Sequence, residues 1–444
     1  MNTVLGIILV LGLMILVHEW GHFIVARLFG VRVDVFSIGF GPRLFGWKRG
    51  ATDYRISALP LGGYVRMAGQ DITEIDSGEK GPTGAPDEVM SKARWQRALI
   101  SFAGPAVNLV MPILLLGGFY VIKGFPYQSY QDKPVVFSEL PLNGPLVKSG
   151  VSDGDQLVSV NGTPTPDWKK AITTLNEMTP GQNVRMTISS KGVAKEIQLN
   201  GADVKPGEHL IGYPPERAVV GQLSAGMPAK RAGLQKGDVI VSVNGVAVHS
   251  WLHCVDLIKK SGGSPIKMDL LRSGKPISFQ IQPVQDRDEE GQLVWKIGVG
   301  QEADFSFRAM TFGQSFATAT EETVGATENL LGVLGKLFTG KLSVKQLQGF
   351  VGIAVRAGQA VQSGPVDTVE LMAMISLNLG VLNLLPIPIL DGGHILLLSI
   401  EGIRRRDLSL AFKERFIQVG FVFLLLLFAF VMYNDVRHLL PTHT

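Results

Sequence analysis

Apolar residues in this chain gather in a few long runs instead of spreading evenly. The first run covers Thr3 to Val17 and resumes over Phe23 to Ala26, and the second covers about Ala98 to Ile122. The third run extends from Glu370 to about Ile403, and the fourth from Phe416 to Tyr433. Each run approaches or exceeds the roughly 20 residues with which a helix crosses a bilayer. The pattern therefore predicts four transmembrane helices.

An N-terminal apolar run is also typical of a cleaved signal peptide, so the first run needs a second criterion. No basic residue precedes it, and no small-x-small cleavage site follows it. It leads instead into the polar segment His18–His22. We therefore expect this run to be retained as a membrane helix.

Basic residues in short loops predict the orientation of the helices. Arg404, Arg405 and Arg406 lie between the third and fourth runs, and the loop after the first run is also basic. Because cytoplasmic loops carry an excess of Lys and Arg, both loops are predicted to be cytoplasmic. Both termini and the stretch from Lys123 to Glu370 then face outward, which in the inner membrane of a bacterium means the periplasm. The basic residues after the first run are Arg27, Arg32, Arg43, Lys48, Arg49, Arg55 and Arg66.

The long stretch between the second and third runs contains an internal repeat. Ser149–Gly162 returns 83 residues later as Ala232–Gly245, and Trp168 returns as Trp251 at the same offset. In both copies Gly-Asp is followed by an apolar run and then by Asn-Gly, which is typical of a turn, a strand and a tight turn. The sequence therefore predicts two copies of a β-rich domain of about 80 residues.

Composition narrows the class of protein. Of 444 residues, 46% are hydrophobic and only 18% are charged, which excludes an ordinary soluble enzyme and a disordered chain. The net charge of +4 is too small to indicate nucleic-acid binding. A single cysteine, Cys254, excludes an internal disulfide and a cysteine-rich metal site.

Two histidines in the first apolar run carry the clearest chemistry. His18 and His22 are four residues apart on a predicted helix, so both imidazoles project from one face, with Glu19 about 100° round. This spacing suits two Zn²⁺ ligands and a carboxylate that takes a proton from the metal's water. Ionisable groups in a membrane helix are costly without a partner. The segment therefore predicts a metal site.

A tetrahedral catalytic zinc needs a further protein ligand, for which Asp391 is the candidate. It follows Pro386 and Pro388, which stop a helix at that point. Such non-helical backbone at membrane depth is tolerated where it is buried in protein or lines a wet cavity. Counted from the outside, His18 lies about 15 and Asp391 about 20 residues into their runs, so both fall in the cytoplasmic half and can meet.

Taken together, these motifs resemble the site-2 protease family of intramembrane zinc metalloproteases, and the repeat resembles the PDZ domains of bacterial envelope proteases. The resemblance covers essentially the whole chain, in the same order. Gln348–Ile353 departs from it, because that family usually carries Ser-Gly-Pro there. The supporting segments are His18–His22, Phe36–Pro42, Leu59–Val65, Phe102–Pro105 with Asn108, and Asn383–Gly393.

The resemblance implies a multi-span α-helical membrane protein with four transmembrane helices, a membrane-associated β-hairpin or sheet, and two periplasmic PDZ-like β domains. We expect a hairpin from Tyr54–Leu59 and Tyr64–Met67, and an amphipathic helix over Phe305–Gly340 that either lies along the outer membrane surface or simply packs. The expected regions are 1–124 (helices one and two, with the histidine motif and the β region), 125–212 (first PDZ-like domain), 213–303 (second PDZ-like domain), 304–369 (amphipathic linker) and 370–444 (helices three and four).

The same resemblance implies roles for particular residues. His18, His22 and Asp391 would bind Zn²⁺, and Glu19 would be the general base. Asn383 would bind substrate backbone or steady the site, with Asn378 in support, although interhelical hydrogen bonding is the alternative for both asparagines. His394 is expected to be structural. No role is assigned to His209, His249, His253, His438 or His443.

The implied function is that of an intramembrane zinc endopeptidase acting in regulated intramembrane proteolysis during the envelope stress response. Its expected substrates are shortened single-span membrane proteins, such as an anti-sigma factor stub or remnant signal peptides. A catalytically silent PDZ receptor is the alternative, against which the retention of Glu19 argues. Metal transport is a weaker one, because few ionisable residues line the other spans. The PDZ grooves could capture peptide ends or act as spacers.

Overall fold

The structure is a computed structural model of the whole chain. It describes residues 8–69, 83–138, 140, 144–176, 178, 181–201, 210–214, 216–224, 226–287, 293–302, 305–339 and 349–439. The expected departure at Gln348 lies outside this part of the chain.

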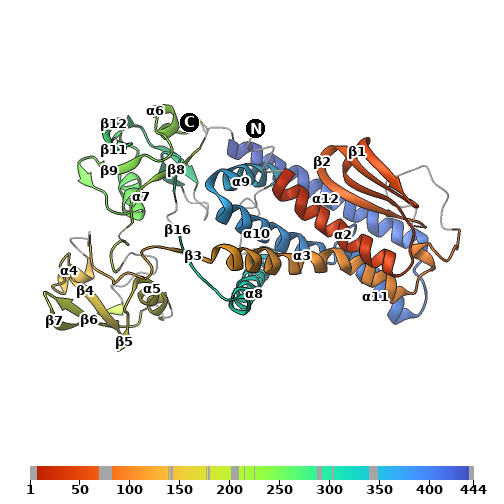
Figure 1. The fold of residues 1–444 in the computed structure, drawn as a ribbon, viewed down its shortest axis with the longest axis horizontal. Coiled ribbons are helices and arrows are strands. Elements are labelled where there is room, and N and C mark those ends of the chain that lie inside the picture. Colours follow the sequence, from red (N-terminus) through yellow and green to blue (C-terminus); the bar gives the residue numbers. More distant parts are fainter. Residues whose placement is uncertain are drawn as a thin grey trace. The chain divides into compact units, whose positions relative to one another are not determined.

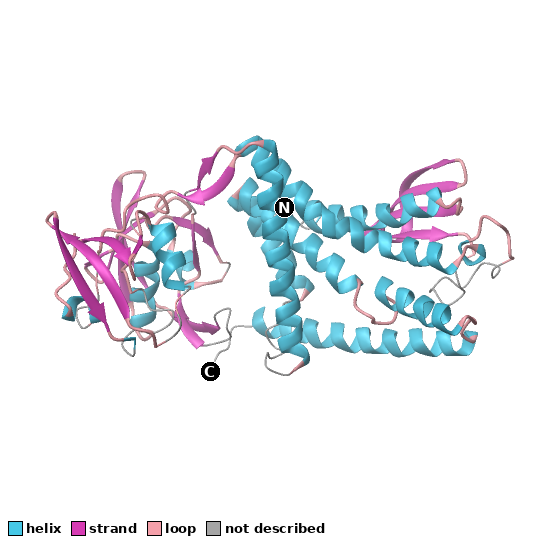
Figure 2. Cartoon of the chain, turned by 90° about the horizontal axis from the view of Figure 1, so that it is seen from below, coloured by secondary structure: helices cyan, strands magenta, loops and turns pink. Residues whose placement is uncertain are grey.

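The chain folds into two compact units (Figure 1). One is built from both ends of the sequence, 1–125 and 309–444, and the other from 126–308 between them. Helices dominate the first unit, and strands dominate the second (Figure 2).

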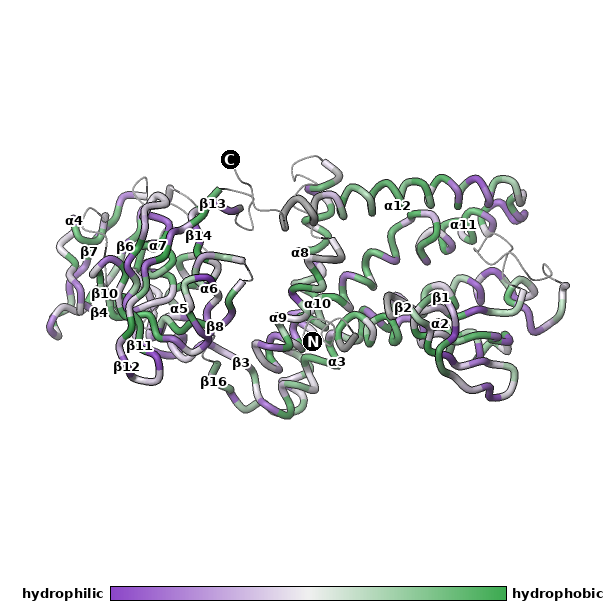
Figure 3. The backbone as a smooth tube through the Cα atoms, turned by 90° about the horizontal axis from the view of Figure 1, so that it is seen from above, coloured by the Kyte–Doolittle hydropathy of each residue, from purple (hydrophilic) through white to green (hydrophobic). Residues whose placement is uncertain are grey.

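The helices of the first unit contain the predicted membrane spans. Among the described residues, four of its helical segments are long and apolar enough to cross a membrane, which agrees with the prediction of four: Val10–Leu28, Arg94–Lys123, Pro365–Asn383 and Ala411–Tyr433. The last has the highest mean hydropathy of the four, and most of α12 is green in Figure 3. The helices are η1 (Ile8–Gly12), α2 (Leu13–Leu28), η2 (Val89–Ser91), α3 (Arg94–Lys123), α8 (Phe312–Phe338), α9 (Phe350–Ser363), α10 (Pro365–Asn383), α11 (Asp391–Arg404) and α12 (Leu410–Leu439).

The third predicted run is divided in two, because its prolines stop the helix as expected. Helix α10 ends at Asn383, residues 384–390 are not helical, and α11 begins at Asp391. Ile389 in this break has a φ of 80°, a left-handed conformation that a β-branched residue rarely adopts. The break places a carboxylate at the start of a helix, where the helix dipole favours negative charge.

Two long strands of the first unit form a folded-over sheet beside α2. Strand β1 (Val33–Arg49) and strand β2 (Thr52–Met67) each bend, so that residues 33–38 lie between 63–67 and 53–56. Residues 43–49 then pair with the outer side of 52–57. The expected hairpin of Tyr54–Leu59 with Tyr64–Met67 is therefore wrong in detail, because the first half of β1 separates these two segments. The sheet packs on α2 through Phe23, whose ring lies 5.3 Å from that of Phe36.

The second unit holds the two repeats, which fold alike. The sheet order is β5-β4-β6-β7 in the first copy and β10-β9-β11-β12 in the second, and each copy has its own core, containing Trp168 or Trp251. The elements are α4 (Pro145–Lys148), β4 (Gln156–Val160), β5 (Thr163–Pro164), α5 (Trp168–Asn176), β6 (Val184–Ser190) and β7 (Val193–Leu199), then α6 (Pro228–Ala232), β9 (Val239–Val243), β10 (Val246–Ala247), α7 (Trp251–Lys260), β11 (Ile266–Arg272) and β12 (Lys275–Ile281).

The predicted Asn-Gly turns are present in both copies. Asn161 and Asn244 have φ values of 48° and 51°, and the glycines that follow have φ values of 78° and 79°. Two successive residues with positive φ are the mark of the tight hairpin turn that Asn-Gly favours. The side chain of each asparagine also accepts a hydrogen bond from a backbone N–H of the neighbouring strand, at 2.8 Å.

The linker after the repeats differs from the sequence expectation. Phe305–Arg308 is a strand, β16, which pairs with β3 (Phe125–Gln128), so the helix starts only at Phe312. Helix α8 packs on α3, where Gly117 leaves room for the ring of Phe316. The remaining strands of the second unit are β8 (Val220–Leu223), β13 (Val284–Arg287), β14 (Leu293–Lys296) and β15 (Val299–Gln301), of which β8 pairs with β15 and β13 with β14.

Candidate metal centre

Helix α2 presents two imidazoles on one buried face. His18 and His22 are 8% and 9% exposed, and their Nε2 atoms lie 3.2 Å apart. The four-residue spacing places them one turn apart, as the sequence predicts. Their rings are nearly perpendicular, at 80°.

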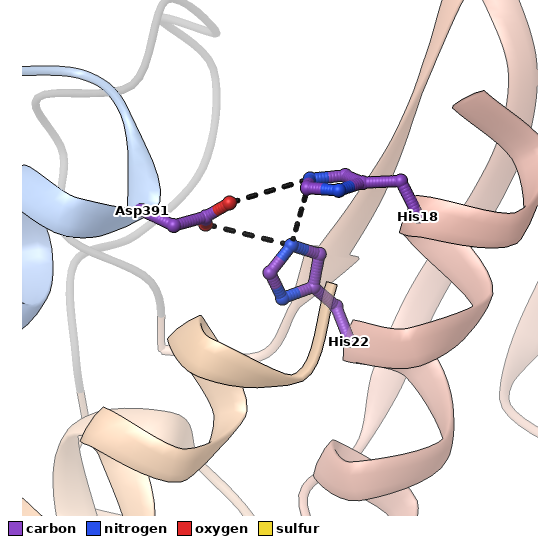
Figure 4. A group of neighbouring side chains, drawn as sticks. All are labelled: His18, His22 and Asp391. Carbon is purple, nitrogen blue, oxygen red and sulfur yellow. Dashed lines mark hydrogen bonds and ion pairs between the residues drawn. The ribbon is translucent and has the colours of Figure 1, made fainter. Parts of the chain in front are cut away.

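Asp391 reaches both imidazoles from a distant part of the sequence. Its Oδ2 lies 3.3 Å from His18 Nε2, and its Oδ1 lies 3.4 Å from His22 Nε2 (Figure 4). The carboxylate belongs to the first residue of α11, directly after the proline-rich break. Within the part of the chain that the structure describes, this is the one group of three such side chains close enough to hold a metal ion.

The other nitrogen of each ring determines whether Nε2 is free to bind a cation. His22 Nδ1 donates to the carbonyl oxygen of Ile100 at 2.7 Å, which leaves Nε2 without a proton in the neutral ring. His18 Nδ1 lies 3.3 Å from the amide nitrogen of Asn108, while the buried Oδ1 of Asn108 has no partner. Turning this amide over brings Oδ1 to His18 Nδ1 and supplies the missing acceptor. Both Nε2 lone pairs then face Asp391.

This arrangement fits a divalent cation such as zinc. Two imidazole lone pairs and a carboxylate that converge at these distances repel one another unless a positive charge lies among them. Zinc–nitrogen and zinc–oxygen bonds of about 2.0–2.1 Å give a tetrahedron whose edge is about 3.3 Å. The three separations between ligand atoms are 3.2, 3.3 and 3.4 Å.

Small residues bring the helices close enough to assemble this group. A Cβ added at Gly104 of α3 would collide with Nε2 of His22, and one added at Gly21 of α2 would lie 2.6 Å from the carbonyl oxygen of Ala103. Close helix approach at small residues is typical of membrane proteins. These glycines therefore set the position of the His22 ring.

Glu19 lies between the metal-ligand candidates and the folded-over sheet. The Val65 N–H of the edge segment 63–67 donates to its carboxylate. A Cβ added at Gly63 would lie 3.2 Å from Glu19 Cγ, so this glycine lets the strand pass close to the side chain. The carboxylate thus faces the group of ligands from one side while strand β2 holds it from the other.

The structure separates the two asparagines that the sequence analysis considered together. Asn383 Nδ2 lies 3.4 Å from His18 Nε2, so this residue belongs to the site. Asn378 instead lines a cavity of about 170 Å³ with Ile353 and Arg356. His394 follows Asp391 by three residues on α11 and is not part of the group of ligands.

Sequence reasoning gave no role to Asn108, which the structure places against His18. The available signal was a polar residue in the middle of an apolar span, which is costly unless it is paired. Among the unassigned histidines, His253 stacks on Tyr213 in the second unit, with ring centroids 5.2 Å apart. His209, His443 and the side chain of His438 lie outside the described residues.

Comparisons with known proteins agree with this geometry. Residues 6–427 match peptidase family M50. The chain is 31% identical to the regulator of sigma-E protease RseP of Escherichia coli, with 97% of this chain and 98% of that protein covered. It is also 31% identical to protease RseP of Yersinia pestis, with the same coverage, and to a protein of Neisseria meningitidis that is named as a zinc metalloprotease, with 99% and 100% covered.

Proposed function

The chain belongs to peptidase family M50 and is a zinc metalloendopeptidase, and from this premise we propose that it cleaves the transmembrane segments of single-span membrane proteins that another protease has already shortened. The observation that carries the proposal is the meeting of His18 and His22, which lie in a helix long enough to span a membrane, with Asp391, which begins α11 after the break that follows the span Pro365–Asn383.

We assign His18, His22 and Asp391 as the residues that hold zinc. Each offers an atom at a separation suited to tetrahedral binding, which leaves a fourth position for water or substrate. When bound, zinc supplies a Lewis acid that polarises the scissile carbonyl and acidifies a water molecule. Asn108 and the carbonyl of Ile100 orient the two imidazoles through their Nδ1 atoms.

Glu19 is the general base of the proposed reaction. It lies beside the ligands without belonging to their group, and the Val65 N–H fixes its carboxylate. The carboxylate takes a proton from the attacking water and passes it to the nitrogen of the leaving amine. Asn383, whose amide is close to His18 Nε2, is placed to donate a hydrogen bond to the substrate carbonyl.

The edge of the folded-over sheet is the proposed place where the substrate unwinds. Segment 63–67 forms the end of the sheet order next to 33–38, and its Val65 N–H donates to the carboxylate of Glu19. A helix that unwinds in a membrane must find new partners for its backbone groups. Strand addition along this edge would supply them beside the general base.

The two repeats are proposed to be PDZ-like domains on the periplasmic side of the inner membrane, where both termini would also lie. The exposed basic residues Arg404, at the end of α11, and Arg405 and Arg406, which follow it, support this orientation. The Escherichia coli relative is named as a regulator of sigma-E protease, which supports an anti-sigma factor stub as substrate; remnant signal peptides are a second class. A catalytically silent receptor is disfavoured, because Glu19 and all three ligands are retained.

The proposal is tested with purified full-length protein in nanodiscs, by zinc analysis and by cleavage of a shortened single-span substrate. We expect about one zinc per chain, and a Glu19→Gln variant that keeps the zinc but cleaves about 10²- to 10⁴-fold more slowly. Glu414→Gln, an exposed glutamate of α12, is the matched control and should cleave normally. Normal cleavage by Glu19→Gln would refute the assigned role.

The sheet-edge proposal has its own test. Cysteines introduced at Arg66, in the edge segment, and at Arg49, in the outer segment, are compared in the Glu19→Gln background. A substrate with a cysteine near the scissile bond should crosslink through position 66 and not through position 49. The native Cys254 is buried in the second repeat and should not interfere. Equal crosslinking at both positions would contradict strand addition at this edge.

A further inference from the structure

A second cavity of the first unit lies apart from the zinc ligands. It has a volume of about 700 Å³ and lies between the start of α3 and the end of α11, which run alongside each other (Figure 1). Its volume is within the range typical of small-molecule sites. Its lining is formed from polar residues, Lys92, Arg94, Arg97, Ser399 and Asp407, and from a largely apolar set, Met90, Ala93, Trp95, Ala98, Leu398 and Gly402.

The charges that line this cavity do not balance. Three cationic side chains face one carboxylate, Asp407, which Arg94 already binds through Nη2 at 2.7 Å and Nε at 3.3 Å. Lys92 Nζ donates to the carbonyl oxygen of Pro86, which carries no charge. Within the described residues, the guanidinium of Arg97 donates no hydrogen bond. The cavity therefore keeps an excess of two positive charges.

The pKa of Asp407 is lowered by the positive charges around it. The hydrogen bond from Arg94 lowers the pKa of its carboxyl, burial opposes this, and the charges of Arg94, Lys413 and Arg97 lower the pKa further. The carboxylate is thus fully ionised near neutral pH and still neutralises only one of the three cations. An anion entering the cavity would meet a favourable field.

An apolar surface continues from this charged cavity along α3. Trp95, Leu99 and Phe102 follow one another at the spacing of a single helix face, and they are 60%, 44% and 41% exposed. Tryptophan is enriched at the level of lipid headgroups, and Trp95 stands in the first turn of a 30-residue apolar helix. A molecule that is anionic at one end and apolar along its length therefore matches both parts of this surface.

We propose that this cavity binds the phosphate group of an anionic phospholipid, with Lys92 and Arg97 on the phosphate and the acyl chains along Trp95, Leu99 and Phe102. This recognition of a phosphate group and acyl chains applies to a phospholipid of either leaflet of the membrane. The proposal goes beyond proteolysis, because it concerns residues outside the zinc site.

The test measures lipid retention by native mass spectrometry of the full-length protein. The protein is released from nanodiscs that contain about four parts phosphatidylcholine to one part phosphatidylglycerol. We expect the wild type to retain one phosphatidylglycerol preferentially. Each cation near a membrane surface contributes about fivefold to anionic lipid binding, so Lys92→Gln with Arg97→Gln should weaken retention about 25-fold. Measuring the Glu19→Gln protein in parallel makes the result independent of cleavage.

Two controls each lose one positive charge elsewhere. Lys123→Gln lies at the opposite end of α3, and Arg404→Gln lies on α11 outside the lining of the cavity. Both should retain the lipid as the wild type does. Equal retention by the double variant and the wild type would overturn the proposal. A third arm offers soluble glycerol phosphate, and binding as tight as that of phosphatidylglycerol would assign the site to a free phosphate ester and overturn its assignment to a lipid.

Discussion

Each unit of the molecule contains a largely buried aspartate, and the two differ in what surrounds the carboxylate. Asp238 of the second repeat is 1% exposed, and it accepts two hydrogen bonds of 2.8 Å from the guanidinium of Arg272 and one of 2.8 Å from the Gln235 N–H. Asp391 of the first unit pairs with two imidazoles, and in the part of the chain that the structure describes it pairs with no arginine or lysine. One carboxylate is paired with a guanidinium that is always charged, and the other is paired with imidazoles that are neutral when they bind a metal.

The comparison teaches how to separate a structural ion pair from a metal centre. Burying a carboxylate costs free energy unless a cation or several donors compensate it. Around Asp238 the chain itself provides that compensation, so nothing further is needed. Around Asp391 the proposed arrangement directs the Nδ1 atoms of both imidazoles toward acceptors, so that the three remaining ligand atoms suit a cation from outside the chain.

The largest effect is expected when each of the two aspartates is replaced by asparagine. Asp391→Asn removes the negative ligand, so zinc should be lost and cleavage should fall about 10²-fold or more. Asp238→Asn should leave the zinc content unchanged, because its neighbours form a closed pair with Arg272. Zinc is measured by mass spectrometry and cleavage with a single-span substrate. Loss of zinc in Asp238→Asn would show that the two regions are coupled and would break the comparison.

A smaller effect is expected at Asn108, which we propose orients the ring of His18. Asn108→Leu removes the acceptor for Nδ1–H, and outer partners of metal-ligating histidines contribute about 10- to 100-fold to affinity. We expect zinc affinity to fall by this factor, measured by competition with a fluorescent chelator. Ser376→Ala is the matched control, because Ser376 donates to the backbone oxygen of Asn108 and does not contact His18. Equal weakening in both variants would assign the effect to helix packing.

The sequence predicts some of this architecture well and some of it poorly, for physical reasons. The four spans and the two repeats follow from long apolar runs and from Asn-Gly turns, which are local signals. The meeting of Asp391 with the histidines could be predicted from depth and from the high cost of isolated charges in lipid. The double pairing of residues 33–38 in the sheet depends on tertiary contacts, as does the contact of Asn108 with His18. No local pattern specifies them.

The two repeats extend the comparison within the second unit. Asp155, the counterpart of Asp238, accepts from the Ser152 N–H and from the hydroxyl of Ser190 in place of an arginine. Asp238→Ala leaves the guanidinium of Arg272 without its carboxylate, whereas Asp155→Ala leaves only a hydroxyl and an N–H. We expect local hydrogen exchange of the full-length protein to accelerate about tenfold in β9 and β11 for Asp238→Ala, and less in β4 and β6 for Asp155→Ala. Equal acceleration would remove the distinction between the repeats.

The smallest expected effect is a difference in the pH at which acid acts on Asp238 and on the zinc ligands. Burial raises the pKa of Asp238, but the hydrogen bonds from Arg272 and the Gln235 N–H outweigh burial and hold the pKa below its ordinary value. A carboxyl whose pKa is lower in the folded state stabilises that state fully above the unfolded-state pKa of about 3.9. This contribution is lost as the pH falls through the lower folded-state value.

Zinc should leave at a higher pH, because protons compete with the metal for imidazole nitrogens as the solution is acidified from neutrality. Between about pH 6 and pH 4, zinc content should therefore fall while hydrogen exchange in β9 and β11 stays slow, and exchange should accelerate only below about pH 4. In Arg272→Gln the folded-state pKa of Asp238 moves back toward its ordinary value, so the contribution that acid can remove is smaller and the acceleration below about pH 4 becomes shallower. The contrary result would be faster hydrogen exchange in β9 and β11 at the same pH at which zinc is lost, both in the wild type and in Arg272→Gln. That result would show that the pairing of Asp238 with Arg272 depends on the metal centre.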